Sequence, residues 1–119
     1  MNYKQKIGKY GEDLVCKFLE RNGYQIISQN IKISFQEIDI IAKYEDLLVF
    51  VEVKTRTNIS FGEADETITE RKTTNLKRAI SHYLANNNLD ASKIRLDLVA
   101  VDLDKIKNSA RIRHYKDIF

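Results

Sequence analysis

Two neighbouring stretches of the sequence combine acidic and basic side chains with strand-forming apolar residues. They read EIDII over residues 37–41 and VFVEVK over residues 49–54. Carboxylates that lie close together bind hard divalent cations such as Mg²⁺ through oxygen, and a nearby lysine can orient water or stabilise charge on a phosphoryl group. The residue types therefore indicate metal-assisted hydrolysis of a phosphate ester, with Asp39, Glu52 and Lys54 as candidate catalytic residues.

The spacing of these residues predicts how they meet. If both stretches are strands of a hairpin that turns at residues 45–46, Asp39 lies opposite Glu52, and Glu37 lies opposite Lys54. Because side chains alternate between the faces of a sheet, Asp39, Glu52 and Lys54 then share one face. Two unit charges about 4 Å apart repel by about 4 kcal/mol at an effective dielectric constant of about 20, a repulsion that a bound cation would reverse.

The alternative for this hairpin is purely structural. Glu37 and Lys54 would then form a surface ion pair that contributes little to stability, and Asp39 and Glu52 would point outward at a sheet edge. The flanking residues argue against this alternative, because apolar runs with little alternation are typical of strands covered on both faces. A carboxylate among such residues needs a partner.

Glu12 is a candidate fourth member of the site and a candidate metal ligand. Residues 3–22 carry apolar side chains at helical spacing, and Glu12 borders that apolar stripe. Gly8 and Gly11 would let this helix approach the sheet closely, so that Glu12 reaches the metal directly or through water. The alternative is an ordinary solvated glutamate near the start of a helix, where acidic residues are favoured.

The rest of the chain predicts the elements that position these residues. The helical spacing ends at Gly23, a residue suited to a left-handed helix cap. A second helix begins near Thr67 and Glu70, which have capping-box spacing, and ends at residues 86–88. Strands are expected at residues 24–33, 37–44, 47–54, 94–101 and 110–115, the last as an edge strand. The order αβββαβ(β) predicts an α/β fold with a mixed sheet flanked by helices, in which the second helix joins parallel strands.

The composition agrees with a single domain over residues 1–119. Apolar residues make up 43% of the chain, enough for one core, and the formal net charge of +3 is compatible with nucleic acid without arguing for it. Cys16 is the only cysteine, which excludes an internal disulfide and a zinc knuckle, and its place in the apolar stripe predicts a buried thiol. No stretch has the character of a membrane span or a signal peptide, so a cytoplasmic protein is expected.

Several motifs together resemble one known family. They are GxxGE at residues 8–12, EID at 37–39, VFVEVKTR at 49–56, Gly62, Lys72 and RxD at 95–97. This set spans nearly the whole chain and resembles the YraN family of small bacterial proteins, with VFVEVKTR as its most specific part. That family is similar to the archaeal Holliday-junction resolvases and the wider PD-(D/E)xK nucleases. The resemblance implies a restriction-endonuclease-like fold, dependence on Mg²⁺ or Mn²⁺, and hydrolysis of DNA.

The resemblance also assigns roles by position. Asp39 matches the motif aspartate, residues 52–54 match the ExK motif, and Glu12 matches the amino-terminal acid. Two positions depart from the pattern: Ile38 stands where the motif has proline, and Gln36 stands where the family usually has glycine. Neither change removes a metal ligand, and the intact acids and lysine favour an active nuclease.

Other residues have weaker claims. Arg56 and Lys72 are predicted to contact DNA phosphates, with solvated surface side chains as the alternative. Arg95 and Asp97 would share a strand face, and we favour a structural role for them. The polar stretch over residues 55–63 is a candidate flap over the substrate, because loops at the ends of active strands often carry function.

Together these features predict a Mg²⁺- or Mn²⁺-dependent deoxyribonuclease in which Asp39, Glu52 and Glu12 hold the metal. Its expected substrate is flapped or branched DNA, because a domain of this size offers little room for reading a base sequence. A homodimer is expected from the resemblance to resolvases. Two alternatives stay open: a non-catalytic module that binds nucleic acid or a protein partner, and an α/β scaffold in which the ExK motif is accidental.

Overall fold

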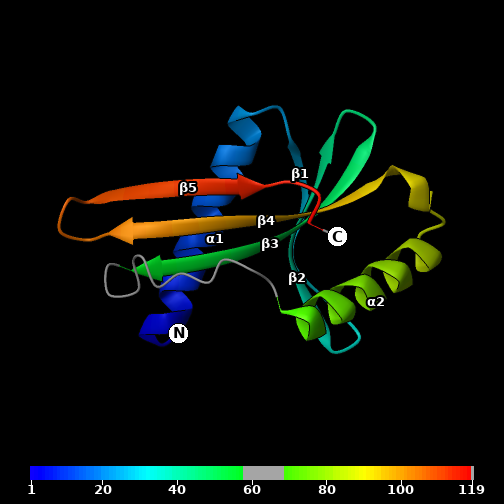
Figure 1. Ribbon diagram of the computed structural model, residues 1–119, viewed down its shortest axis with the longest axis horizontal. Helices are drawn as coiled ribbons and strands as arrows, with labels where there is room; N and C mark the ends of the chain where they lie inside the picture. The colour runs from blue at the N-terminus through cyan, green and yellow to red at the C-terminus, as the bar shows by residue number, and fades with distance from the viewer. Residues whose placement is uncertain (58–68, 119) are drawn as a thin grey trace.

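A computed structural model of the chain describes residues 1–57 and 69–118 (Figure 1). Its elements, in chain order, are α1 (Tyr3–Arg21), β1 (Gln25–Ile33), β2 (Gln36–Tyr44), β3 (Leu47–Thr57), α2 (Glu70–Asn86), the 3₁₀ turn η2 (Ala91–Lys93), β4 (Ile94–Asp104) and β5 (Ser109–Tyr115). This order confirms the predicted α/β fold, in which a mixed sheet is flanked by helices.

The five strands form one sheet in the order β1-β2-β3-β4-β5. Neighbouring strands are antiparallel except β3 and β4, which run parallel and are joined by a crossover that contains α2. This confirms the predicted crossover, because parallel neighbours need a long connection.

The strands β3 and β4 are longer than predicted. They end at Thr57 and Asp104 rather than at residues 54 and 101, because their pairing continues to Thr57 and Leu103. Polar residues 55–57, which the sequence assigned to a candidate flap, are therefore part of the sheet. Their pairing with β4 makes them a strand although they are not apolar. Residues 58–63 of that predicted flap lie outside the described residues.

The two helices cover opposite faces of the sheet. Figure 1 shows α1 crossing behind β3, β4 and β5, with α2 lying away from it, towards β2. The α1 face buries Val15, Leu19, Ile40, Ala42, Val49, Val51, Val99 and Val101. The α2 face buries Ile38, Ile41, Phe50, Leu76, Ile80 and Leu96. Because β3 contributes Val49 and Val51 to one layer and Phe50 to the other, its apolar run is nearly continuous.

Both helices end as the sequence predicts. Gly23 has a φ of 91°, and the N–H of Tyr24 donates to the carbonyl of Leu19 at 3.0 Å. Asn88 takes the same left-handed conformation after α2, with a φ of 55°. This backbone motif satisfies carbonyls that the helix itself leaves without a partner.

The start of α2 differs from the prediction. Thr69, rather than Thr67, is the N-cap residue, and its side-chain oxygen accepts a hydrogen bond from the backbone N–H of Lys72 at 3.2 Å. Thr67 itself lies outside the described residues. Either threonine could accept a hydrogen bond from the backbone N–H three residues further along the chain, so the sequence alone does not show which one is the N-cap.

The sequence also led to expectations about the Cys16 thiol and about membrane-spanning helices. Cys16 is buried, and burial raises the pKa of its thiol to about 11. The predicted burial of Cys16 is confirmed, and a thiol with a raised pKa is a poor nucleophile. Among the described residues, no helix is both long and apolar enough to cross a membrane.

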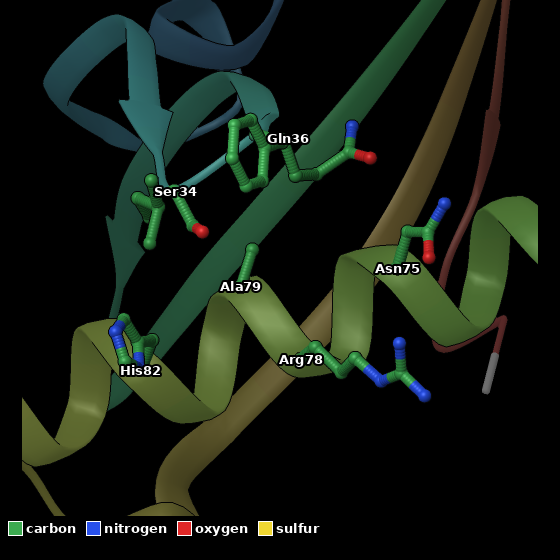
Figure 2. Close-up of a pocket in the computed structure, with 8 residues that line it drawn as sticks. Ser34, Gln36, Asn75, Arg78, Ala79 and His82 are labelled. Carbon is green, nitrogen blue, oxygen red and sulfur yellow. The ribbon is translucent and has the colours of Figure 1, made fainter.

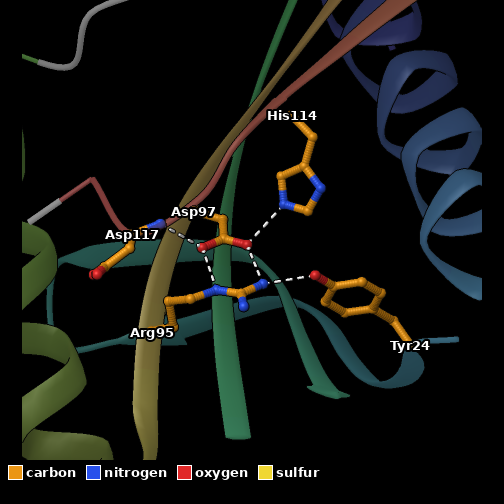
Figure 3. Close-up of polar contacts among 5 residues, drawn as sticks. All are labelled: Tyr24, Arg95, Asp97, His114 and Asp117. Atoms are coloured by element: carbon orange, nitrogen blue, oxygen red, sulfur yellow. Dashed lines mark hydrogen bonds and ion pairs between the residues drawn. The ribbon is translucent and has the colours of Figure 1, made fainter. Parts of the chain in front are cut away.

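A buried carboxylate ties the end of the chain to the α1 side of the sheet (Figure 3). Asp97 is 0% exposed and accepts hydrogen bonds from Arg95 Nε and Nη2, both at 2.8 Å. His114 Nε2 lies 2.7 Å from the same carboxylate, and the N–H of Asp117 donates to it at 3.0 Å. Arg95 also donates to the hydroxyl of Tyr24 at 2.6 Å. The pairing agrees with the structural role favoured for Arg95 and Asp97.

We expect Asp97→Ala to lower the free energy of unfolding by about 3–5 kcal/mol, the cost of breaking a buried ion pair. Burial raises the pKa of Asp97, but its hydrogen-bond donors outweigh burial and hold the pKa below its usual range. The contribution of Asp97 to the free energy of unfolding is therefore fully present when the pH is above the ordinary aspartate pKa. It is lost as the pH falls through the lower pKa of the folded state. Urea denaturation at neutral and acidic pH measures both effects.

The control for this variant is Asp46→Ala, which removes an exposed partner of Lys93. We expect it to change the free energy of unfolding by less than about 1 kcal/mol. Equal losses in the two variants would contradict the structural importance of Asp97.

Candidate metal centre

The β2–β3 hairpin follows the predicted register up to the candidate site and then departs from it. The pairing ends at Ile40 and Val51. The predicted rungs at Asp39 and Glu37 are therefore not part of the ladder that the structure describes. Instead, Asp39 Oδ2 accepts a hydrogen bond from the backbone N–H of Val53 at 2.8 Å. A side chain thus joins the two strands where the backbone pairing stops.

At the same position β2 rolls about its own axis, so that the regular alternation of its side chains between the two faces is broken at Asp39. Ile38 and Ile41 pack on the α2 face although they are three residues apart, while Ile40 packs on the α1 face. Strict alternation would place Ile38 with Ile40. Asn30 lies in β1 between the residues that pair with Ile38 and Ile40, and its φ of 52° is in the left-handed region. Both strands therefore deviate at the same level, which directs the Asp39 carboxylate towards β3.

Three carboxylates converge beside this roll. Ligand oxygens of Glu12 from α1, and of Glu37 and Asp39 from β2, all lie within 4.8 Å of one another. Two oxygens on opposite sides of one cation are separated by twice the metal–oxygen distance, about 4.2 Å for Mg²⁺ and about 5 Å for Ca²⁺. The donor atoms therefore suit one hard divalent cation in both chemistry and spacing.

The structure groups the acids differently from the sequence-based hypothesis. It brings Glu12 to Asp39, and it adds Glu37, which the predicted register had placed opposite Lys54. The spacing of Glu37 and Asp39 could have identified this pair, because residues two apart in a strand point to the same side. Glu52 also neighbours Asp39, and its side chain raises the pKa of the Asp39 carboxyl.

Glu12 reaches the cluster because α1 lies very close to β3 at the preceding residue. A Cβ atom added to Gly11 would lie 2.8 Å from both Cβ and Cγ2 of Thr55, and nearer still to its hydroxyl. The backbone fixes the Cβ of Thr55, so a change of rotamer would not remove the overlap. A Cβ added to Gly8 meets nothing within 4 Å. Of the two predicted glycines, only Gly11 is needed for the close approach.

The remaining predicted residues follow one another along β3. Glu52 is 8% exposed, and its Oε2 lies 3.3 Å from Nζ of Lys72 in α2. Lys54 and Arg56 are half-buried and continue the strand face of Glu52, because side chains two apart point to the same side. The ion pair between Lys72 and Glu52 places α2 against the site, a contact that the sequence did not predict.

Burial and crowding raise the pKa values of these carboxylates. Burial, and then the charge of Asp39, raise the pKa of Glu12 to about 7. A hydrogen bond from Asn30 acts in the opposite direction and lowers it. Burial, and then the hydrogen bond and charge of Glu52, raise the pKa of Asp39 well above its usual range, against the N–H of Val53. The acids therefore hold protons near neutral pH, and a divalent cation would displace them.

A separate cavity of about 280 Å³ lies between the β1–β2 turn and α2 (Figure 2). Figure 2 shows Ser34 and Gln36 on the turn side, with Ala79 and His82 on the helix and the Arg78 guanidinium pointing away from the turn. Among the described residues, none of the site carboxylates lines this cavity. It is therefore distinct from the candidate metal centre.

The sequence is similar to a set of bacterial proteins named for one family. Residues 11–101 match the model of the uncharacterised protein family UPF0102. A UPF0102 protein of Flavobacterium psychrophilum is 42% identical over 113 residues, which cover 95% of this chain and 92% of the relative. A UPF0102 protein of Clostridioides difficile is 39% identical over 119 residues, which cover 100% of both chains.

Two solved structures are also similar to this chain. SfsA of Pyrococcus furiosus, solved in complex with Ca²⁺, has a TM-score of 0.46 and 13% identity over 94% of this chain and 63% of that chain. An XisH family protein of Nostoc punctiforme has a TM-score of 0.42 and 14% identity over 88% of this chain and 98% of that chain.

We expect Gly11→Ala to destabilise the protein by about 1–3 kcal/mol, as overpacking does, and to weaken binding of divalent cations. The new methyl group would push α1 away from Thr55 and withdraw Glu12 from Asp39. Thermal denaturation and calorimetric titration with Mn²⁺ measure the two effects.

Gly8→Ala is the matched control for this variant, because its methyl group enters open space and should leave Mn²⁺ affinity unchanged. Adding Thr55→Gly to Gly11→Ala removes the overlapping atoms and should restore affinity. Unchanged Mn²⁺ affinity in Gly11→Ala would contradict the positioning role of Gly11.

We expect the metal-free protein to lose stability as the pH rises from about 5 to about 8. Folded Glu12 keeps its proton up to a pKa of about 7, whereas the unfolded chain releases it near the ordinary glutamate value. Between these values the folded state binds more protons, so the free energy of unfolding falls with rising pH. Thermal denaturation in EDTA across this range measures the decline.

Glu12→Gln should make this decline shallower, because the variant lacks one of the two acids, Glu12 and Asp39, whose pKa values are raised in the folded state. Asp13→Asn removes an exposed acid from the next position of α1 and should preserve the decline. Mg²⁺ should add more stability to the wild type than to Glu12→Gln. An unchanged decline in Glu12→Gln would show that the pH dependence arises elsewhere.

Proposed function

This chain belongs to the uncharacterised protein family UPF0102, and we propose that it is a metal-dependent nuclease that hydrolyses phosphodiester bonds in DNA. The family match confirms the predicted resemblance to the YraN family. One observation carries the proposal: Glu12, Glu37 and Asp39 converge within 4.8 Å beside an ExK motif whose Glu52 is buried. Crowded carboxylates oppose folding, so this arrangement favours a site for a cation.

Mg²⁺ or Mn²⁺ is the proposed cation, because carboxylate oxygens suit hard ions. Glu12, Glu37 and Asp39 would hold it, with Glu52 on β3 beside Asp39. When bound, such an ion polarises a phosphoryl oxygen and lowers the pKa of water.

The basic residues supply the rest of the proposed chemistry. Lys54 would orient the attacking water or stabilise negative charge on the phosphoryl oxygens. Lys72 holds the Glu52 carboxylate through their ion pair. Arg56 and Lys72 are proposed to contact neighbouring phosphates. The water oxygen bonds to phosphorus as the bond to the 3′ oxygen breaks, which leaves a 3′-hydroxyl and a 5′-phosphate, as in the nucleases that the sequence resembles.

Flapped or branched DNA is the proposed substrate. The described elements are a sheet and two helices that position the site, which leaves little surface for a separate module that reads base sequence. A homodimer is proposed from the resemblance to resolvases.

We expect Asp39→Asn to abolish cleavage and to weaken Mg²⁺ and Mn²⁺ binding by more than the roughly tenfold loss seen for supporting groups. Asparagine keeps an acceptor for the N–H of Val53 but removes the charge. Calorimetric titration measures binding, and the same samples are incubated with single-stranded, flapped and four-way-junction DNA. Asp46→Asn removes an exposed acid from the turn of the same hairpin and should change neither result.

We expect Lys54→Gln to separate DNA cleavage from cation binding. Loss of one charge-stabilising donor lowers the cleavage rate by about 10²–10³-fold, while the carboxylates that bind the cation remain. Binding of cations without cleavage of any DNA by the wild type would favour the non-catalytic module. Absence of cation binding in the wild type would exclude the site described above.

A further inference from the structure

A second cavity adjoins the metal centre on its α1 side. It has a volume of about 330 Å³ and lies between the start of α1 and the end of β3. Glu12 lines it and is also one of the three converging carboxylates. Val53 lines it as well, and the N–H of Val53 holds Asp39. The cavity therefore shares its wall with the candidate metal centre, unlike the cavity in Figure 2.

The lining of this cavity combines apolar and positively charged residues with the carboxylate of Glu12. Ile7 and Val53 supply aliphatic surface, and Tyr3 supplies an aromatic ring on a side chain that is 61% exposed. Lys4 and Arg56 bring two cations to the lining. Nζ of a third cation, Lys105, lies 4.1 Å from the centroid of the Tyr3 ring.

Such a lining matches a nucleotide. A base is an apolar, planar ring system that stacks on aromatic side chains, and its phosphate is attracted by lysine and arginine. The volume is near the lower end of the range for small-ligand sites, about 300–1,000 Å³. One nucleotide fits such a space only when its base is unpaired, because a paired base stays within the duplex stack.

We propose that this cavity receives one unpaired nucleotide next to the phosphate that is cleaved, so that the enzyme requires single-stranded character at the cut. Resting on the proposed nuclease function, the inference adds that the substrate is recognised at one nucleotide through Tyr3 and the neighbouring cations. A fully paired duplex would not fill the cavity.

Gly8 offers a direct test, because it lines the cavity and an added Cβ meets nothing within 4 Å. Gly8→Leu would fill the cavity without disturbing the core, and Gly8→Ala is the matched control with a similar gain in helix propensity. Tyr3→Ala removes the exposed ring. The probes are a short fluorescein-labelled single strand and the blunt duplex of the same sequence, both in buffer with Ca²⁺, and fluorescence anisotropy gives their affinities.

We expect Gly8→Leu and Tyr3→Ala to bind the single strand about tenfold more weakly than the wild type, the scale of one lost stacking contact. Gly8→Ala should bind it normally, and none of the variants should change affinity for the duplex. Calorimetric titration with Mn²⁺ should give wild-type affinity in Gly8→Leu, which shows that the metal centre is intact.

The outcomes separate the cavity from the nuclease function. Wild-type affinity of Gly8→Leu and Tyr3→Ala for the single strand would overturn the inference, even if the wild type cleaves DNA. Weakened binding in these variants without cleavage by the wild type would overturn the nuclease function and keep the cavity as a nucleotide site. Tighter binding of the blunt duplex than of the single strand by the wild type would also overturn the inference.

Discussion

Repulsion between carboxylates at the level of Asp39 is the constraint on which the candidate site depends. Asp39, Glu52 and Glu12 are each held against that repulsion by a different part of the fold. The N–H of Val53 holds Asp39, and Lys72 of α2 holds Glu52. The close approach of α1 at Gly11 brings Glu12. Because these contacts come from both helices and the central hairpin, the site exists only when all three have packed.

Other buried carboxylates show that this arrangement is unusual within the protein. Asp97 meets Arg95, and Asp102 meets Arg113, so each negative charge lies against a guanidinium. Such pairing is the ordinary solution for a buried charge. Asp39 instead has another carboxylate beside it. The fold therefore pairs Asp97 and Asp102 with arginines, and it leaves Asp39 and Glu12 dependent on protons or a cation.

The sequence predicts the features of the fold that depend on residue spacing within one element or hairpin. It predicts less well the features that depend on contacts between distant elements. The hairpin register, the left-handed cap at Gly23 and the approach of Glu12 to Asp39 follow from spacing and turn chemistry. The roll at Asp39 does not, because it coincides with an unusual conformation of Asn30 on another strand. The Lys72–Glu52 ion pair depends on where the crossover places α2, which no local pattern specifies.

The parallel pairing of β3 with β4 also has a consequence for how the chain assembles. The β1–β2 and β2–β3 hairpins have two-residue turns, and hairpins form within about 1–10 μs. Pairing with β4 must wait for the longer crossover to close, which is slower. Until then, β3 is an apolar strand with an unpaired edge, the kind of segment that aggregates. Charged residues that interrupt such a strand oppose pairing between chains. Glu52, Lys54 and Arg56 follow the apolar run of β3, where such charges would oppose pairing between two unfinished chains.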